Sequence, residues 1–260
     1  MIHKLSYALL FSLALIAFIG CEAEEFSIQI LGVKPIDTKT CGSDSNEQSF
    51  MANGLVDIAI SGDYNIYLSM TNRLLNSLEV NNLTAKDGRI NTTDITISGA
   101  TIEYLDPDEV GFGFSEDRRK ISFSGLLRAN GASILNQGMN ILTPEMMTIL
   151  RNHGAFQGVS ADGRPTPIRS IIPLDIQIQV EGKTLDGKDV LSNIINFPIS
   201  ICTGCRVAAS ETDTDCEIMS EEEVELISEC PASIGRDNGY ASCALCNQIV
   251  APKFASLCKL

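Results

Sequence analysis

The chain of 260 residues contains 33 acidic and 19 basic side chains, which give it a formal charge of −14 at neutral pH. A protein of that charge repels the phosphates of nucleic acids and the surfaces of anionic membranes, so we expect no nucleic-acid binding. Hydrophobic residues make up 44% of the chain, well above the level of disordered chains, and the length suits one or two folded domains.

The first 20 residues have the pattern of an export signal. A short head that contains Lys4 precedes an unbroken apolar run at residues 5–20, which ends in Gly20 next to Cys21. A positive head, an apolar stretch and a small residue before the cleavage point are typical of signal peptides. A membrane-spanning helix is the alternative, but it needs about 20 apolar residues, and here the acidic Glu22 follows at once. We therefore predict that these 20 residues are a signal peptide.

The four residues Phe18-Ile19-Gly20-Cys21 resemble the lipobox of bacterial lipoproteins. The resemblance implies that the chain is cut before Cys21, that a diacylglycerol is attached to its thiol, and that an acyl chain such as palmitate is added to the new amine. Residues 21–25 would then form a lipidated tether. Each buried CH₂ group contributes about 0.8 kcal/mol, so two or three acyl chains attach a protein stably to a membrane.

The residue after the lipidated cysteine also carries information in this family. Glu22, rather than Asp, implies the outer membrane of the bacterial cell envelope in preference to the inner one. The partners implied are the membrane, through the lipid anchor, and an envelope protein. Alternatively, an ordinary signal peptidase could cut after Ala23, because Cys21 and Ala23 place small residues at the two positions that this enzyme reads. That product would be secreted without a lipid.

Between residues 26 and 201, apolar and polar side chains alternate with a period of two, which is typical of strands with one buried face. The turn sequence Ser61-Gly62-Asp63 predicts a hairpin between the second and third strands. A phase change of the alternation at Gly99 predicts a β-bulge, and Pro198 predicts an edge position or a bulge. The alternation marks seven candidate strands, at residues 26–30, 56–60, 64–70, 95–104, 121–123, 174–180 and 195–201.

Strands that follow one another with few helices between them favour a mainly β, antiparallel sandwich over a parallel α/β fold. The segment YNIYLSMTN at residues 64–72 is similar to immunoglobulin-like modules of cell-envelope proteins. This resemblance implies an immunoglobulin-like β-sandwich at residues 26–201. We expect one helix inside an insertion at about residues 127–172, because Thr143 is a good N-cap and Pro144 suits the first turn.

Eight cysteines follow Cys21, an even number that predicts up to four disulfides in an exported protein. Seven of the eight lie after Ile201, so complete pairing requires at least one bridge from the tail to Cys41. Residues 202–260 are too charged for a good core, so we expect a small disulfide-rich C-terminal module. The pairing stays open among the candidates, which are Cys41, Cys202, Cys205, Cys216, Cys230, Cys243, Cys246 and Cys258.

Two pairs of these cysteines have the CxxC spacing, Cys202 with Cys205 and Cys243 with Cys246. In a reducing compartment such pairs indicate structural zinc, whereas in an exported chain disulfides account for more of the cysteines. A redox-active CxxC prefers a helix N-terminus, which lowers the thiol pKa. The acidic stretch at residues 213–215 would raise it instead. We therefore expect bridges rather than metal or redox chemistry.

The sequence shows no catalytic constellation. His153 is the only histidine after the signal segment, and its position at the end of the expected helix suits interaction with the helix dipole. Acidic clusters at residues 106–109 and 213–215 do not fit an EF-hand loop, so we expect solvated turns there. We expect no metal, no cofactor and no enzymatic activity, but an envelope lipoprotein with a binding or structural role. The alternatives are an envelope thiol oxidoreductase or hydrolase, and a metal-dependent adhesion module.

Overall fold

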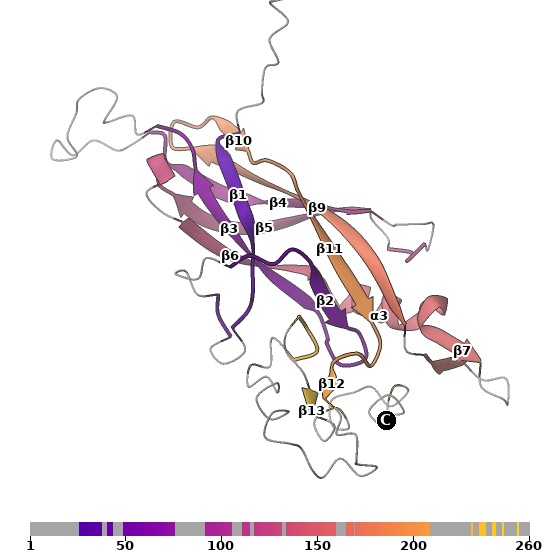
Figure 1. Ribbon diagram of the computed structural model, residues 1–260. Coiled ribbons are helices and arrows are strands. Elements are labelled where there is room, and N and C mark those ends of the chain that lie inside the picture. Colours follow the sequence, from indigo (N-terminus) through magenta and orange to yellow (C-terminus); the bar gives the residue numbers. More distant parts are fainter. Residues whose placement is uncertain are drawn as a thin grey trace, which may run out of the picture.

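The computed structural model describes residues 26–37, 41–43, 49–75, 92–105, 111–114, 117–131, 134–159, 165–168, 170–208, 234–237 and 241–242, together with Cys230, Cys246 and Phe254. Within this part of the chain the fold is mainly β, as the alternation predicts, and α3 (Pro144–Asn152) is its one α-helix. Figure 1 shows two main sheets that face each other, with α3 beside one end of them.

Both main sheets are built mostly from antiparallel pairs. The smaller sheet has the order β1 (Ile28–Lys34), β3 (Tyr64–Asn72) and β6 (Ile134–Leu142). The larger sheet has the order β2 (Gly54–Asp57), β11 (Ile195–Cys202), β9 (Ile171–Thr184), β4 (Ile95–Leu105) and β5 (Arg118–Leu127), and β10 (Asp189–Leu191) also pairs with β9. Its one parallel pair is β2 with β11. The short elements are η3 (Ala129–Gly131), η4 (Gly154–Phe156), β7 (Gln157–Val159), β8 (Pro165–Pro167), β12 (Val207–Ala208) and β13 (Ala241–Ser242).

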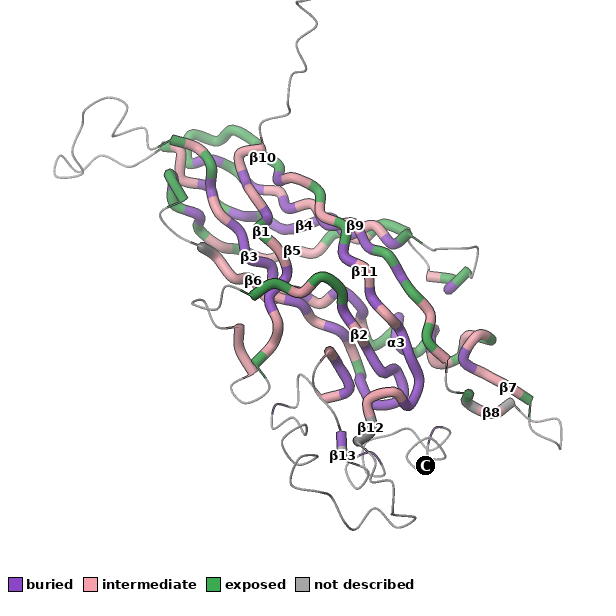
Figure 2. Tube along the Cα trace, in the orientation of Figure 1, coloured by how far each residue is buried: buried purple, intermediate pink, exposed green. Residues whose placement is uncertain are grey.

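The core lies between these sheets. Ile176 and Ile178 of β9 are fully buried in one cluster with Tyr64 and Leu68 of β3. Figure 2 shows buried and more exposed positions alternating along the long strands. Burial of a large aliphatic side chain contributes about 1.5–3 kcal/mol to stability. Strands with one apolar face are therefore stabilised when two sheets pack with those faces together.

The predicted bulge at Gly99 is confirmed. The register of β4 shifts between Ile97 and Gly99 against both of its neighbours, β5 and β9. Ile95 and Ile97 before the bulge are buried, and so are Ala100 and Ile102 after it. One extra residue therefore keeps the apolar side chains on the core side along the whole strand.

The predicted hairpin at Ser61-Gly62-Asp63 is wrong. The strand β2 ends at Asp57, and the amides of Ile60 and Ser61 donate to the Asp57 carbonyl at 3.2 and 2.8 Å, which forms a tight turn. After this turn β3 enters the smaller sheet, whereas β2 belongs to the larger one. The chain therefore crosses between the sheets where the sequence suggested that it would fold back within one.

Pro198 lies in β11, which has neighbours on both sides. It is opposite Asp175 of β9, and the pairing of β11 with β2 begins only at Ile199. The register of β11 with β9 is unbroken from Ile195 to Cys202, so Pro198 marks neither an edge strand nor a bulge, and that prediction is wrong.

The helix prediction within residues 127–172 is confirmed. Thr143 is the N-cap of α3, and Pro144 is its first residue. The same range also contains β6, which pairs with β3. This part of the expected insertion therefore belongs to the sandwich itself.

The described tail residues contact the open edge of β2. Arg236 forms an antiparallel bridge with Val56. The Asp57 amide donates to the Gly235 carbonyl at 2.7 Å, and the Asp237 amide donates to the Leu55 carbonyl at 2.8 Å. These bonds satisfy backbone groups that β2 would otherwise leave unpaired.

Candidate functional site

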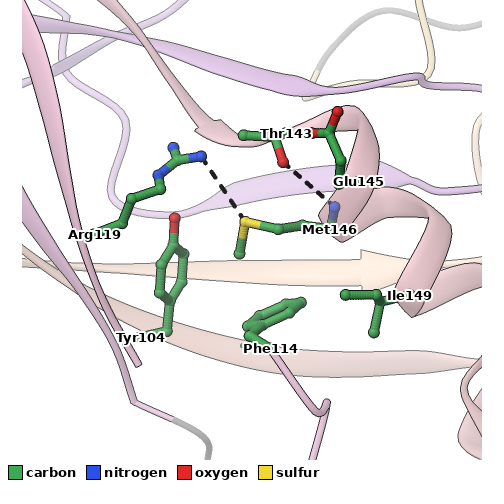
Figure 3. Close-up of a pocket in the computed structure, with 7 residues that line it drawn as sticks. All are labelled: Tyr104, Phe114, Arg119, Thr143, Glu145, Met146 and Ile149. Carbon is green, nitrogen blue, oxygen red and sulfur yellow. Dashed lines mark hydrogen bonds between the residues drawn. The ribbon is translucent and has the colours of Figure 1, made fainter. Parts of the chain in front are cut away.

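A pocket of about 190 Å³ lies where α3 meets β4 and β5 (Figure 3). The rings of Tyr104 and Phe114 form one wall, with centroids 5.4 Å apart in an edge-to-face arrangement. Met146 and Ile149 of α3 form the opposite wall. The residues that line the pocket are Tyr104, Phe114, Arg119, Thr143, Glu145, Met146 and Ile149.

The helix start positions the α3 side of this pocket. The Thr143 hydroxyl accepts a hydrogen bond from the Met146 amide at 3.4 Å, which fixes the first turn. Met146 is buried by this arrangement, whereas Glu145 is exposed at the rim. Hydrogen bonds from its own amide and from the Thr143 hydroxyl lower the pKa of Glu145, so the rim carries a negative charge.

Arg119 and Tyr104 fix the strand side. The Arg119 Nη2 group donates to the carbonyls of Asn140 and Ile141, and Nη1 lies 4.0 Å from the Met146 sulfur. The Tyr104 hydroxyl donates to the Ile141 carbonyl at 2.6 Å. Burial raises the pKa of Tyr104 to about 12, although the positive charge of Arg119 opposes the shift. Tyr104 is therefore a neutral donor at physiological pH.

One polar atom of the Arg119 guanidinium has no hydrogen-bond partner in the described part of the chain. Its Nε atom is buried and makes no hydrogen bond to any described residue. The ion pairs among the described residues join Lys120 to Glu181, Lys183 to Asp189 and Arg236 to Asp63, and none of them includes Arg119. The pocket thus combines apolar walls, a guanidinium group in the wall and a carboxylate at the rim.

A second hollow, of about 240 Å³, lies on the smaller sheet. No charged side chain is among the residues that line it, which are Ile36, Asn65, Tyr67, Gly138, Met139 and Asn140. Charged groups in a concave site supply orientation and specificity. We therefore take the pocket beside α3 as the candidate binding site.

A second cluster surrounds the first CxxC pair, where Cys202 and Cys205 form a disulfide. The side chain of Asp57, from β2, accepts hydrogen bonds at its two oxygens from the amides of Ala59, Gly204 and Arg206, at 2.9–3.0 Å. Burial raises the pKa of Asp57 despite these bonds. A carboxylate oxygen of Asp57 and the two sulfurs all lie within 4.8 Å of one another. The sulfurs of an intact disulfide are not thiolates, so the cluster as it stands does not supply the ligands that a metal needs.

The structure also pairs Cys41 with Cys230, across 189 residues of sequence. This is the bridge between body and tail that the distribution of cysteines required. Cys246 is disulfide-bonded to a partner outside the described residues. The expected sites Cys21, Cys216, Cys243 and Cys258, and the acidic clusters at 106–109 and 213–215, lie outside the described residues as well.

His153 has a structural environment in the described part of the chain. It ends α3, and its Nδ1 atom accepts a hydrogen bond from the Ala155 amide at 3.2 Å, which makes it the N-cap of η4 as well. Its ring lies 5.4 Å from that of Phe112 and 6.5 Å from that of Phe156. The sequence placed His153 at the helix end, and these contacts account for its position there.

Sequence reasoning missed two of the residues that define these sites. Arg119 lies on the same face of β5 as Ile121 and Phe123, because side chains two residues apart in a strand share a face. The alternation could therefore have indicated that Arg119 faces inward. Asp57 stood between Val56 and Ile58, so the alternation placed it on the solvent face. It is instead fully buried, because β2 ends there and its side chain accepts backbone amides from the CxxC loop.

Comparison with models of known protein families and with curated protein sequences gives no match to this chain. Among the described residues, no helix has the length and apolar character needed to cross a membrane.

Proposed function

We propose that this protein is a lipid-anchored lipoprotein of the bacterial cell envelope whose β-sandwich binds a small ligand without chemical conversion. The lipobox-like residues 18–21 and the preceding apolar run support export and attachment at Cys21. The observation that carries the binding role is the pocket beside α3, where the Arg119 Nε atom is buried and makes no hydrogen bond within the described chain.

The chemistry of the pocket defines the class of ligand. A carboxylate would accept from Arg119, a cationic group would face Glu145 at the rim, and an apolar body would pack against Phe114, Met146 and Ile149. A volume of about 190 Å³ suits a single amino acid or a fragment of similar size. We therefore propose small zwitterions with an apolar side chain as the ligand class.

Calorimetric titration of the mature protein tests the binding role. L-Leucine and L-phenylalanine are the first probes, and their amides lack the carboxylate that Arg119 would bind. We expect heat from the free acids, and at least tenfold weaker binding of the amides. Ile149→Trp fills the pocket from its half-buried side and should abolish binding, whereas Leu191→Trp, at an exposed site on β10, should leave it unchanged. Equal heats for the two variants would refute the assignment of the pocket.

The intact mass of the mature protein tests the anchor. Cleavage before Cys21 with two or three acyl chains is the expected result, and Cys21→Ser should release the protein from the membrane fraction. A mature chain that begins after Ala23 would instead establish secretion without a lipid.

We further propose that the two-sheet body is an immunoglobulin-like sandwich. The antiparallel pairing within the smaller sheet and the similarity of residues 64–72 to such modules support this assignment. An experimental structure whose strand order could not be superposed on an immunoglobulin-like module would reject it.

A further inference from the structure

The two cysteines of the Cys202–Cys205 pair differ in exposure. Cys202 ends β11 and is fully buried, whereas Cys205, three residues later, is half-buried and reaches the surface. Thiol–disulfide exchange begins with attack on one sulfur, and the rate depends on access to it. This asymmetry makes Cys205 the sulfur that an external thiolate can reach and Cys202 the shielded leaving group.

The loop is held in place without the sulfur–sulfur bond. The Ile58 amide donates to the Cys202 carbonyl at 2.9 Å, and the amides of Thr203 and Ser170 donate to the Ser170 carbonyl and the Thr203 hydroxyl. The amides of Gly204 and Arg206 donate to Asp57. Reduction would therefore leave the two thiols facing each other, ready to close again.

A carboxyl group lies beside the shielded sulfur. One Asp57 oxygen is within 4.8 Å of both sulfurs, and the side chain is held there by three backbone amides. Burial raises the pKa of Asp57, and the hydrogen bonds from the backbone amides oppose this shift. The positive charge of Arg151 acts on it from α3, where the guanidinium donates to the Ile58 and Ser61 carbonyls at 2.6 and 2.7 Å.

We propose that Cys202–Cys205 is an exchangeable disulfide that oxidises an external dithiol, with attack at Cys205 and with Asp57 as the proton donor to Cys202. This function is separate from ligand binding beside α3. It differs from the sequence-based expectation because Asp57, a buried side chain from β2, lies beside the sulfurs.

A thiolate of the dithiol attacks the Cys205 Sγ atom, the sulfur–sulfur bond breaks, and its electron pair leaves on the Cys202 Sγ atom, which takes the proton of Asp57. The second thiol of the dithiol loses its proton to solvent and attacks the mixed disulfide, which releases Cys205 as a thiolate. Solvent then reprotonates Cys205 and Asp57. Two electrons and two protons pass from the dithiol to the cysteine pair.

The test uses the mature chain with its disulfides intact and dithiothreitol as the dithiol. The rate of reduction of each bridge is followed by alkylation and peptide mass spectrometry. We expect Cys202–Cys205 to be reduced well before Cys41–Cys230, because Asp57 lies beside its sulfurs. Burial does not separate the two bridges, since each has one fully buried and one half-buried cysteine. Reduction of Cys41–Cys230 first, or of both bridges only on unfolding, would overturn the proposal.

Two variants isolate the role of Asp57. Asp57→Asn should slow the reduction of Cys202–Cys205 at least tenfold, because the leaving sulfur loses its proton donor. Asp237→Asn is the control, at a half-buried carboxyl that also accepts a backbone amide, and should change the rate less than twofold. Equal rates for the two variants would remove Asp57 from the mechanism.

A second measurement does not depend on the folding of the Asp57 variant. In Cys202→Ser the remaining Cys205 should form a mixed disulfide with oxidised glutathione. In Cys205→Ser the buried Cys202 should remain unmodified under the same conditions. Modification of Cys202 rather than Cys205 would reverse the assigned direction of attack and refute the proposal.

Discussion

The two described disulfides should differ in what they contribute to stability. The Cys41–Cys230 bridge spans a sequence separation of 189 residues, whereas Cys202–Cys205 spans 3. A disulfide restricts the unfolded chain in proportion to the logarithm of the loop that it closes. The loop-closure relation gives about 5 kcal/mol for the long bridge and about 2 kcal/mol for the short one.

The perturbation is a pair of double serine variants, Cys41→Ser/Cys230→Ser and Cys202→Ser/Cys205→Ser. They are matched in burial, because each replaces one fully buried and one half-buried cysteine. The cost of burying a serine hydroxyl is therefore similar in both. The difference in free energy of unfolding between them, about 3 kcal/mol, isolates the loop-length contribution.

Urea unfolding of both variants, followed by far-ultraviolet circular dichroism without reductant, measures this difference. We expect the variant that lacks the long bridge to have the lower midpoint and a steeper dependence on urea concentration, because its unfolded chain is less compact. A loss from removal of the short bridge that equals or exceeds the loss from the long one would refute the reasoning. It would mean that the CxxC loop is not held by its backbone hydrogen bonds and Asp57.

Two further predictions concern the contact between tail and body. Tyr64→Phe removes the hydroxyl that donates to Asp237 at 2.7 Å. It should lower the free energy of unfolding by about 1 kcal/mol in urea titrations, because the Asp237 oxygen loses one hydrogen bond and keeps the one from the Leu55 amide. An unchanged midpoint would contradict it. Burial raises the pKa of Asp237 above 3.8, so wild-type stability should fall as the pH rises from that value through the raised pKa. Asp237→Asn should show a smaller fall, because Asp57, whose pKa is also raised, still contributes in the same direction. Parallel pH profiles of the two proteins would be the contrary result.

The elements of this fold were largely predictable because burial on one face dictates local alternation. The long strand β9 shows the alternation most clearly, with Leu174, Ile176, Ile178 and Val180 all fully buried. The start of α3 was equally legible, since the N-cap Thr143 acts through contacts within four residues. Such signals depend on residues that are close in sequence, so they can be recognised without knowledge of the tertiary structure.

The long-range features were not predictable in the same way. The parallel pairing of β2 with β11 joins segments that are far apart in sequence, and no local pattern indicates it. The burial of Asp57 depends on that pairing, because its hydrogen-bond donors Gly204 and Arg206 directly follow β11. The candidate pocket likewise forms only where β5 meets α3. The alternation along β5 can indicate that Arg119 faces inward, but it cannot indicate that Arg119 lies beside α3.

The bulge in β4 can be tested at its central residue. An ideal Cβ atom at Gly99 would lie 2.3 Å from the Ile121 carbonyl oxygen, which belongs to the backbone of β5 and cannot turn away. The φ angle of Gly99 lies outside the left-handed region, so any effect of Gly99→Ala is steric. We expect a loss of about 1–3 kcal/mol in the free energy of unfolding, as for other overpacked interiors.

Gly62→Ala provides the matched control, because a Cβ atom there would meet nothing within 4 Å. Replacing glycine by alanine at an unstrained position gains about 0.4–1 kcal/mol through the unfolded chain, so this variant should be as stable as the wild type or slightly more so. Urea titrations compare the two. If Gly99→Ala were as stable as Gly62→Ala, β4 and β5 would have to separate at the bulge without loss of energy. The register shift would then not be a rigid feature that keeps both halves of β4 facing the core.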